Sequence, residues 1–209
     1  MIDKEVYDRL KERFGPYASW AIWHQPEEGK PASNTGTNGL FSNESVLEVL
    51  QTKYVIVGLN ISRDQGNPEP WGNFHSIGNK QRDFKLRYAL WGTSCWGSYM
   101  TDILKDFEEK NSNNVMRAYR ADPSLGKKSF DLFKEELSII KDPTVLIVLG
   151  SAAKKVLEQM EKDFNFIFPD KIYVPHYSMW CSKEVYRRKL LDKLKLVGVS
   201  ECMGFSSGN

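Results

Sequence analysis

The sequence predicts an α/β fold: a three-layer α/β/α domain with a central, four-stranded, mostly parallel sheet. The first observation is a set of short, largely apolar runs at residues 54–57, 98–104, 144–149 and 171–174. Runs of this length, bounded by polar residues or glycine, are typical of buried strands. The second observation is that apolar residues recur at helical spacing between these runs. Strands that alternate with helices favour a parallel sheet with helices on both faces.

The first elements lead up to the first strand. Residues 3–14 are predicted to form a helix because apolar residues recur every three or four positions and Asp3 can cap it. Residues 17–23 are apolar and aromatic, and their pattern leaves the element type open. Residues 24–38 are rich in Pro, Gly, Ser, Thr and Asn, which predicts a loop. Asn43 then caps a short helix before the strand.

The later elements alternate in the same way. Residues 66–80 hold several Gly and Pro and are expected to be irregular. Residues 106–121 are polar and weakly patterned, which predicts a helix followed by a loop. Regular apolar spacing predicts further helices at residues 82–90, 129–141 and 152–162, and a last one capped by Ser182.

Length and composition predict one globular domain over residues 1–203, with a disordered tail at 204–209. The chain has 209 residues, of which 41% are apolar and 27% are charged, as is usual for a globular protein with a sizeable core. No apolar run approaches the length of a bilayer span, and the charged N-terminus lacks the apolar core of a secretory signal. We therefore expect a cytoplasmic monomer without a membrane partner.

The sequence gives no indication of a metal or a nucleotide cofactor. Three scattered cysteines form neither a disulfide framework nor a CxxC site, and His24 and His75 lack a third ligand at a diagnostic spacing. Walker, GxGxxG and GxSxG motifs are absent. A formal charge of +2 does not by itself indicate nucleic acid. Local basic groups such as Arg82, Lys85 and Arg87 could contact phosphates, or form solvated helix faces.

Polar residues follow the first predicted strand at the edge where ligands sit in α/β folds. The strand is expected to end at Gly58, and the chain then turns through Asn60 towards Asp64. Ligands of open α/β sheets lie beyond the carboxyl ends of the strands. Asp64 could hold and polarise a water molecule, and Asn60 could do so more weakly. Both are also ordinary turn residues.

Three more candidates lie on or after the other predicted elements. Asp102 is an acid within an apolar strand, so it should be hydrogen-bonded or face a site, because an unpartnered buried carboxylate is unstable. His176 follows the fourth strand, where it can exchange a hydrogen bond with a ligand or play a structural role. Phe74, with Trp71 beside it, either stacks on a base, worth roughly 1–3 kcal/mol, or covers the sheet edge.

Taken together, these segments resemble the uracil-DNA glycosylase superfamily. VGLNIS at residues 57–62 is similar to the first motif of its mismatch-specific thymine/uracil branch, a Gly-Ile-Asn-Pro-Gly turn whose catalytic Asn matches Asn60. Phe74 lies about where the superfamily places the aromatic residue that stacks on the extruded base. Asp102 falls where many members have an Asn that reads the base edge.

The second motif of the superfamily, His-Pro-Ser, resembles PHYSM at residues 175–179. His176 and Ser178 match its His and Ser. The resemblance implies a uracil-DNA glycosylase-like fold and base flipping followed by hydrolysis of the N-glycosidic bond, without a metal or an organic cofactor. In that mechanism Asn60 or Asp64 would position water, His176 would stabilise the leaving base, and the base site would be formed by Gly58, Phe74, Asp102 and Ser178.

Three departures from the superfamily keep other functions open. Ile61 replaces the Pro of the first motif, position 60 lacks the activating Asp of the best-known branch, and Tyr177 replaces the Pro of the second motif. Asp102 in place of Asn would suit a donor-rich base edge, such as that of guanine or the amino group of cytosine. One alternative is a non-catalytic protein that binds a nucleobase or single-stranded nucleic acid, and the other is a hydrolase of a free nucleoside.

Overall fold

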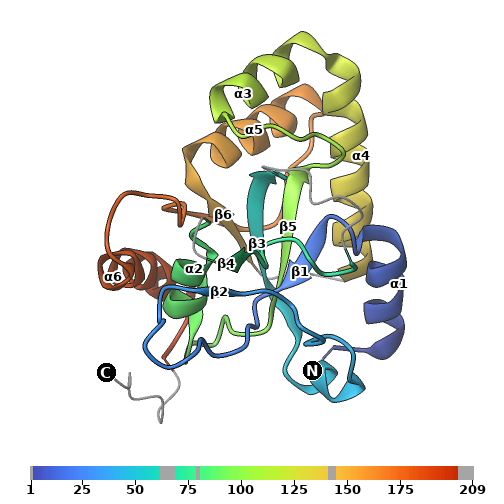
Figure 1. Cartoon of the computed structure of the whole chain (residues 1–209). Helices are drawn as coiled ribbons and strands as arrows, with labels where there is room; N and C mark the ends of the chain where they lie inside the picture. The colour runs from blue at the N-terminus through green and yellow to red at the C-terminus, as the bar shows by residue number, and fades with distance from the viewer. Residues whose placement is uncertain (1, 62–68, 79–80, 141–144, 202–209) are drawn as a thin grey trace.

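The computed structural model describes residues 2–61, 69–78, 81–140 and 145–201, which are built around a five-stranded sheet (Figure 1). The strand order is β1-β5-β3-β6-β7. Four strands are parallel, and β1 runs antiparallel to β5 at one edge. The predicted α/β class and the mostly parallel sheet are confirmed. The strands are β1 (Ala18–Trp20), β3 (Gln51–Asn60), β5 (Ser98–Leu104), β6 (Val145–Leu149) and β7 (Lys171–Val174).

The sheet has one strand more than the four predicted, because the apolar stretch at residues 17–23 supplies β1. Ala18 pairs with Thr101 of β5, and Trp20 pairs with Tyr99. All three residues of β1 are fully buried. Such a short strand, buried throughout, shows no alternation of polar and apolar residues from which its type can be read.

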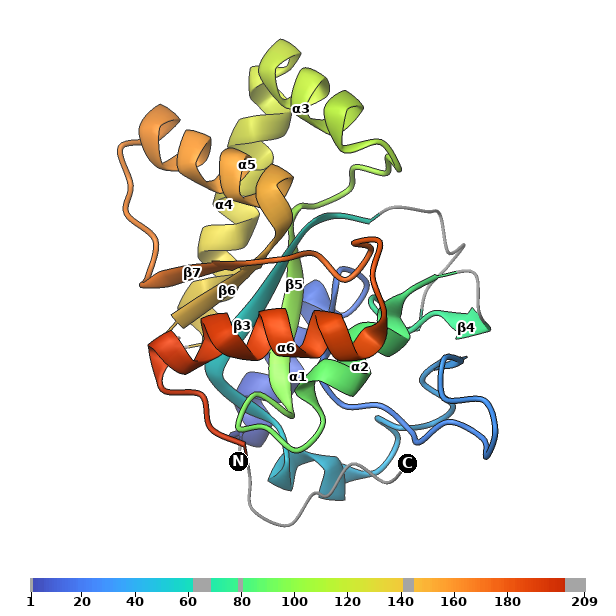
Figure 2. The ribbon, with the colours of Figure 1, turned by 90° about the vertical axis from the view of Figure 1, so that its left-hand side faces the viewer.

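The described part of the chain contains six α-helices, which cover both faces of the sheet. Alternate residues of β3 point to opposite faces: Val55 and Val57 join one apolar cluster, and Tyr54 and Ile56 join another. Figure 2 shows α6 and α2 on the near side of the sheet and α1 behind it. The helices are α1 (Lys4–Phe14), α2 (Asp83–Leu90), α3 (Ser112–Ala121), α4 (Pro123–Ile140), α5 (Gly150–Asp163) and α6 (Lys183–Leu194).

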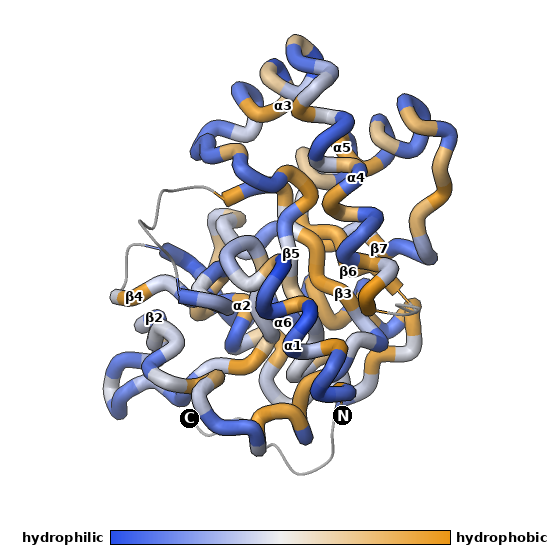
Figure 3. Tube along the Cα trace, turned by 90° about the vertical axis from the view of Figure 1, so that its right-hand side faces the viewer, coloured by the Kyte–Doolittle hydropathy of each residue, from blue (hydrophilic) through white to orange (hydrophobic). Residues whose placement is uncertain are grey.

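The two helix layers follow from these clusters. The cluster on one face takes its helical residues from α1, α3, α4 and α5, and α3 packs on α4 and α5. The cluster on the other face takes its residues from α2 and α6. Figure 3 shows the most hydrophobic stretches in the central strands and hydrophilic stretches on the helices around them. The predicted three layers are therefore present.

Strand β3 is longer than predicted, and the expected turn at residues 58–60 is wrong. Gly58 pairs with Asp102 of β5, and Asn60 pairs with Leu104. Parallel pairing with β5 supplies hydrogen-bond partners to the backbone of these residues, so β-structure continues through glycine and asparagine despite their turn preference.

The order predicted for residues 106–121 is also wrong, because the loop precedes the helix. The Asn111 side chain accepts a hydrogen bond from the backbone N–H of Asn113 (3.0 Å) and caps α3. Val115 and Tyr119, four positions apart, are its buried residues. Helix α4 begins earlier than predicted, at Pro123, a residue type favoured at the first position of a helix.

The remaining elements are short. Within the predicted loop at residues 24–38, β2 (Asn34–Thr35) pairs with β4 (Ile77–Gly78). The described ranges also contain two 3-10 helices, η1 (Glu44–Glu48), which Asn43 caps as predicted, and η2 (Lys195–Val197). None of the helices in the described ranges is both long and apolar enough to cross a membrane. The predicted tail at residues 204–209 lies outside the described residues.

Candidate functional site

A cavity of about 530 Å³ lies beyond the carboxyl ends of the four parallel strands. Its size is within the usual range of small-molecule sites. Asp64 lies outside the described residues. The other predicted site residues all line the cavity: Gly58, Asn60, Phe74, Asp102, His176 and Ser178.

Asp102 lies on β5 as a buried carboxylate, with 3% of its surface exposed. Its Oδ2 accepts a hydrogen bond from Asn73 Nδ2 (2.9 Å). Burial raises the pKa of Asp102 from 3.8 to about 6, against the opposing effects of the Asn73 hydrogen bond and the Lys105 charge. At neutral pH the cavity therefore presents an ionised carboxylate in a poorly solvated position.

Gly58 allows this carboxylate to lie directly against β3. A Cβ atom at position 58 would overlap Asp102 Oδ1 and would lie 3.2 Å from the nearest ring atom of Phe74. Because Gly58 has no side chain, the Asp102 carboxylate of β5 and the Phe74 ring can both pack closely against β3. The requirement for glycine comes from this close approach.

The ring of Phe74 is fixed by the loop that carries it. The backbone of Phe74 is left-handed, with φ of +64°, a conformation that costs of order 1–3 kcal/mol for a residue other than glycine. Asn73 Oδ1 accepts a hydrogen bond from the Phe74 N–H (3.0 Å), and Trp23 Nε1 donates to the Phe74 carbonyl (3.4 Å). Neighbouring side chains therefore hold this backbone in place.

Asn73 is a site residue that the sequence analysis missed. Its Nδ2 donates both to Asp102 Oδ2 (2.9 Å) and to the Tyr17 carbonyl (2.7 Å), while its Oδ1 accepts from Phe74. One buried amide thus orients the carboxylate and the ring at once. Its neighbour Trp71 is fully buried and donates to Tyr7 Oη (2.8 Å), so Trp71 is a core residue.

His176 is held as a neutral ring by Ser178. The backbone N–H of Ser178 donates to His176 Nδ1 (3.1 Å), and Ser178 Oγ lies 2.8 Å from the same nitrogen. Because a backbone N–H can only donate, Nδ1 accepts, and the neutral ring carries its proton on Nε2. Burial lowers the pKa of His176 to about 4, so the ring is neutral at pH 7.

Two further contacts position the imidazole ring. It stacks on the ring of Tyr177, with centroids 4.2 Å apart and planes at 28°. The other side of its Cβ faces Gly150 at the turn from β6 to α5, where an added Cβ would lie 3.0 Å away. Gly150 has φ of +85°, which favours glycine. The ring is therefore enclosed by the β6–α5 turn and by Tyr177.

Asn60 anchors the loop that follows β5. Its Nδ2 donates to the carbonyl oxygens of Ile61 (2.9 Å), Phe107 (3.2 Å) and Glu109 (2.9 Å). This arrangement engages the amide nitrogen with backbone groups, and no hydrogen bond to the amide oxygen is formed within the described residues. Asn60 is a strand residue with a structural role in the loop, and not the turn residue of the alternative prediction.

A buried ion pair lies behind Asp102. Lys105 Nζ and Glu136 Oε2 are 2.8 Å apart, and both side chains are fully buried. Lys105 also donates to Thr101 Oγ1 (2.8 Å) and to the Asp102 carbonyl, while Glu136 Oε1 accepts from Tyr99 Oη (2.8 Å). The backbone of β5 at Asp102 is thereby tied to α4.

Arg82, Lys85 and Arg87, for which the sequence left phosphate contacts and solvated helix faces open, donate to backbone carbonyls. Arg82 donates to the Ser178 and Met179 carbonyls (both 3.3 Å), and Lys85 donates to the Met179 carbonyl (2.7 Å). Arg87 is buried and donates to two carbonyls of the 24–38 loop. By donating to backbone carbonyls, these cations hold the loop after β7 and the loop before β2 in place.

Trp180 is an exposed aromatic residue at the end of the same loop, and the sequence analysis did not single it out. Its side chain is 89% exposed, and the guanidinium of Arg82 lies 4.9 Å from its ring centroid. A large exposed ring beside a cavity is available to a ligand.

The described residues contain no group of three His, Cys, Asp or Glu side chains that could hold a metal. The rings of His75 and His24 bind backbone carbonyls, those of Trp20 (3.3 Å) and Thr37 (3.1 Å). These contacts give both histidines a structural role. Cys95 is buried with a free thiol, whose pKa burial raises to about 12.

Comparison with known proteins does not assign the chain to a family. Neither the scan against protein-family models nor the search of curated proteins gives a match for the chain.

Proposed function

We propose that the protein is a DNA glycosylase-like enzyme that binds an extruded nucleobase in the cavity and hydrolyses its N-glycosidic bond. The observation that carries the proposal is the convergence of Phe74, Asp102 and His176 on one cavity. Together they supply an aromatic face, a hydrogen-bond acceptor for a base edge and a hydrogen-bond donor for a leaving group. These are the three functions that base recognition and departure require.

Recognition of the base would rest on Phe74 and Asp102. Phe74 offers a fixed ring on which a base can stack, an interaction worth roughly 1–3 kcal/mol. Asp102 Oδ2 already accepts from Asn73, and the remaining lone pairs of the carboxylate accept from the base. An ionised carboxylate only accepts, so the cavity favours a base edge with two adjacent donors, as in guanine, over the mixed edge of uracil.

Hydrolysis would use His176 as a neutral donor. The bond that breaks joins the base nitrogen to C1′ of the sugar, and its electron pair leaves with the base. A hydrogen bond from His176 Nε2–H stabilises the negative charge that develops there. A water molecule held by Asp64 or by the Asn60 oxygen adds its oxygen to C1′, and the proton that it loses ends on the departing base.

Trp180 supports a nucleic acid as the partner, in preference to a free nucleoside. The exposed ring lies at the end of the loop that carries His176 and Ser178, and Arg82 lies over it. A ring in this position can stack on a neighbouring base or insert beside the extruded one. A free nucleoside has no second base for such a contact.

A second candidate is a nucleobase-binding protein without hydrolysis. The hydrogen bonds of Asn60 favour it, since its amide nitrogen is taken by three backbone carbonyls. In this candidate Phe74 and Asp102 keep their roles, and no water is activated.

The test is an excision assay with purified protein. Labelled single- and double-stranded oligonucleotides carry 8-oxoguanine, which keeps the two adjacent donors of guanine, or uracil, hypoxanthine, xanthine or mismatched thymine, and alkali then cuts at abasic sites. Free nucleosides are assayed in parallel for release of the base. His176→Ala is the test variant, and His24→Ala, a histidine outside the cavity, is the matched control.

We expect cleavage with at least one base, lost in His176→Ala and kept in His24→Ala. Base-dependent binding without cleavage would select the second candidate, and release of base from nucleosides alone would select a nucleoside hydrolase. Folded protein that neither cleaves nor binds any of these bases would overturn the proposal.

A further inference from the structure

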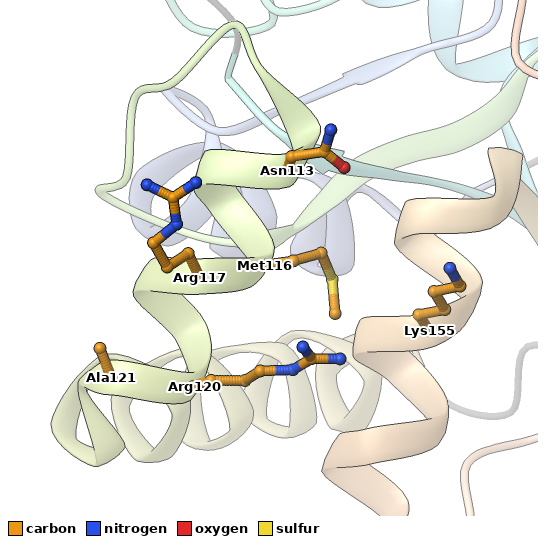
Figure 4. A pocket seen from close by; sticks show the side chains of 6 residues that line it. All are labelled: Asn113, Met116, Arg117, Arg120, Ala121 and Lys155. Atoms are coloured by element: carbon orange, nitrogen blue, oxygen red, sulfur yellow. The ribbon is translucent and has the colours of Figure 1, made fainter.

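A second cavity, of about 490 Å³, lies between α3 and α5 (Figure 4). We call it the α3–α5 groove. Three of its lining residues are cationic and none is acidic. The lining residues are Asn113, Met116, Arg117, Arg120, Ala121 and Lys155.

The cations of this groove are exposed and have no partner among the described residues. The side chains of Arg117, Arg120 and Lys155 form no hydrogen bond or ion pair there. By contrast, the adjacent Lys154 pairs with Glu158 (3.8 Å) and lies over a tyrosine ring. The donors of the groove are therefore available to an anion.

Two of the cations come from the two helices that border the groove. In Figure 4 the side chain of Arg120 extends from α3 towards α5, and Lys155 is carried by the facing part of α5. Met116 lies between them, whereas Arg117 leaves α3 on the other side. Two cations that line one cavity with no acid among its lining residues repel each other, and a bound anion would remove this repulsion.

The groove continues from the first cavity. Ser112 of α3 and Ser151 of α5 line the first cavity. Ser112, Met116 and Arg120 follow one another at intervals of four residues and so share one face of α3, as Ser151 and Lys155 do on α5. At 1.5 Å per residue, Arg120 lies about 12 Å along α3 from Ser112. Helices α3 and α5 thus border both the first cavity and the groove that is lined by Arg120 and Lys155.

We propose that the α3–α5 groove binds backbone phosphate of the nucleic acid strand whose base enters the first cavity, with Arg120 and Lys155 as the phosphate ligands. The proposal rests on the proposed function for the identity of the strand. Phosphate oxygens accept from the planar guanidinium of Arg120 in a bidentate manner and from the ammonium of Lys155 as a point charge. The substrate is then a polynucleotide, because a free nucleoside carries no phosphate into the groove.

One acidic residue lies near the entrance of the groove. Glu109 lines the first cavity, and its carboxylate accepts from the Asn111 N–H (2.8 Å) and from Asn114 Nδ2 (3.1 Å) at the start of α3. The Glu109 carboxylate is engaged by the start of α3, so Arg120, farther along α3, and Lys155 on α5 keep their attraction for phosphate.

The experiment measures binding of a fluorescein-labelled single-stranded 15-mer at several salt concentrations. The variants are Arg120→Gln, Lys155→Gln and the double variant, with Lys162→Gln, an exposed lysine of α5 outside the groove, as the matched control. Each single change is expected to weaken binding roughly twofold to fivefold, the range of exposed ion pairs. The double variant should lower the slope of log K against log salt by about 0.7, the contribution of one phosphate contact to a single strand.

Binding by the double variant with the affinity and salt slope of the unmodified protein would overturn the proposal. So would equal weakening by Lys162→Gln, which would indicate general charge attraction. Inorganic phosphate is added as a competitor at constant ionic strength to separate the possible sources of phosphate. If it displaces the 15-mer at a similar concentration of phosphate groups, the site takes free phosphate and the assignment to a strand is wrong.

Failure of the proposed function would give a different pattern. In that case no base is excised or preferred, yet binding of the 15-mer still depends on Arg120 and Lys155. If the groove proposal is wrong, base-dependent activity is still observed, and the double variant has the same activity as the unmodified protein.

Discussion

Replacing Asp102 by Asn should stabilise the protein at neutral pH, although it removes a central residue of the candidate site. The carboxylate is 3% exposed and its pKa is raised by burial from 3.8 to about 6. Asn has nearly the same shape, and its amide oxygen can still accept from Asn73 Nδ2. The substitution therefore removes the ionisation of residue 102 and preserves most of its packing.

The magnitude follows from the difference between the two pKa values. A rise from 3.8 to about 6 corresponds to about 3 kcal/mol, since each pKa unit is worth 1.36 kcal/mol. The folded state binds the proton of Asp102 more tightly than the unfolded state does between these values. The free energy of unfolding of the unmodified protein therefore falls as the pH rises from about 4 to about 6, and this contribution is constant above that. The free energy of unfolding of Asp102→Asn does not fall in this way, because its residue 102 cannot ionise.

The assay is urea unfolding of the unmodified protein and of Asp102→Asn at intervals from pH 3.5 to pH 8. The difference in the free energy of unfolding between them should shift by about 3 kcal/mol in favour of Asp102→Asn from the acid end to the neutral end. Asp192→Asn, the same change at an exposed position of α6, corrects for the loss of an ordinary carboxylate.

A difference that is constant with pH, or that changes in the opposite direction, would refute this reasoning. Asp102 would then have a solvated carboxylate or a compensating partner, and the acceptor role assigned to it in base recognition would lose its physical basis.

Three other predictions test the same region. Gly58→Ala should destabilise the fold by about 1–3 kcal/mol in urea unfolding and abolish base-dependent binding, because its Cβ overlaps Asp102 Oδ1; unchanged binding would contradict the close approach. Lys105→Met should destabilise by about 3–5 kcal/mol because it leaves the buried Glu136 carboxylate unpaired. Adding Glu136→Gln should recover part of that loss, and a double variant no more stable than the single one would argue against the ion pair. Base-dependent binding should strengthen as the pH rises through about 6, where Asp102 ionises, and Asp102→Asn should remove this dependence in a binding titration.

The sequence was sufficient to predict the elements with strong local patterns. The strands β5, β6 and β7 and the caps at Asp3 and Ser182 lie where their patterns indicate, because burial of alternating or continuous apolar residues and capping are local effects. β1 and the end of β3 were not predicted because they depend on pairing with a strand that is distant in the sequence. Their backbones pair with β5, residues 98–104, and no residue near β1 in the sequence indicates that partner.

The candidate site was predictable in outline from topology. Parallel strands present their carboxyl ends at one edge, and this rule brought Asp102 and His176 together. The contacts that tune the site were not predictable. Asn73 reaches Asp102 across 29 positions of the chain, and Asn60 binds carbonyls 47 and 49 positions away. Such distant hydrogen bonds depend on the finished fold.

The buried charge of Asp102 also predicts that binding of a base would raise the thermal stability of the protein. Lys105 and Glu136 neutralise each other in the core, so the Asp102 carboxylate remains as an additional buried negative charge. A base that donates two hydrogen bonds to this carboxylate would relieve its desolvation and bind only the folded state. Its presence would then raise Tm in proportion to the logarithm of its concentration. A thermal-shift screen of nucleobases and their analogues could thus rank ligands before any reaction is known.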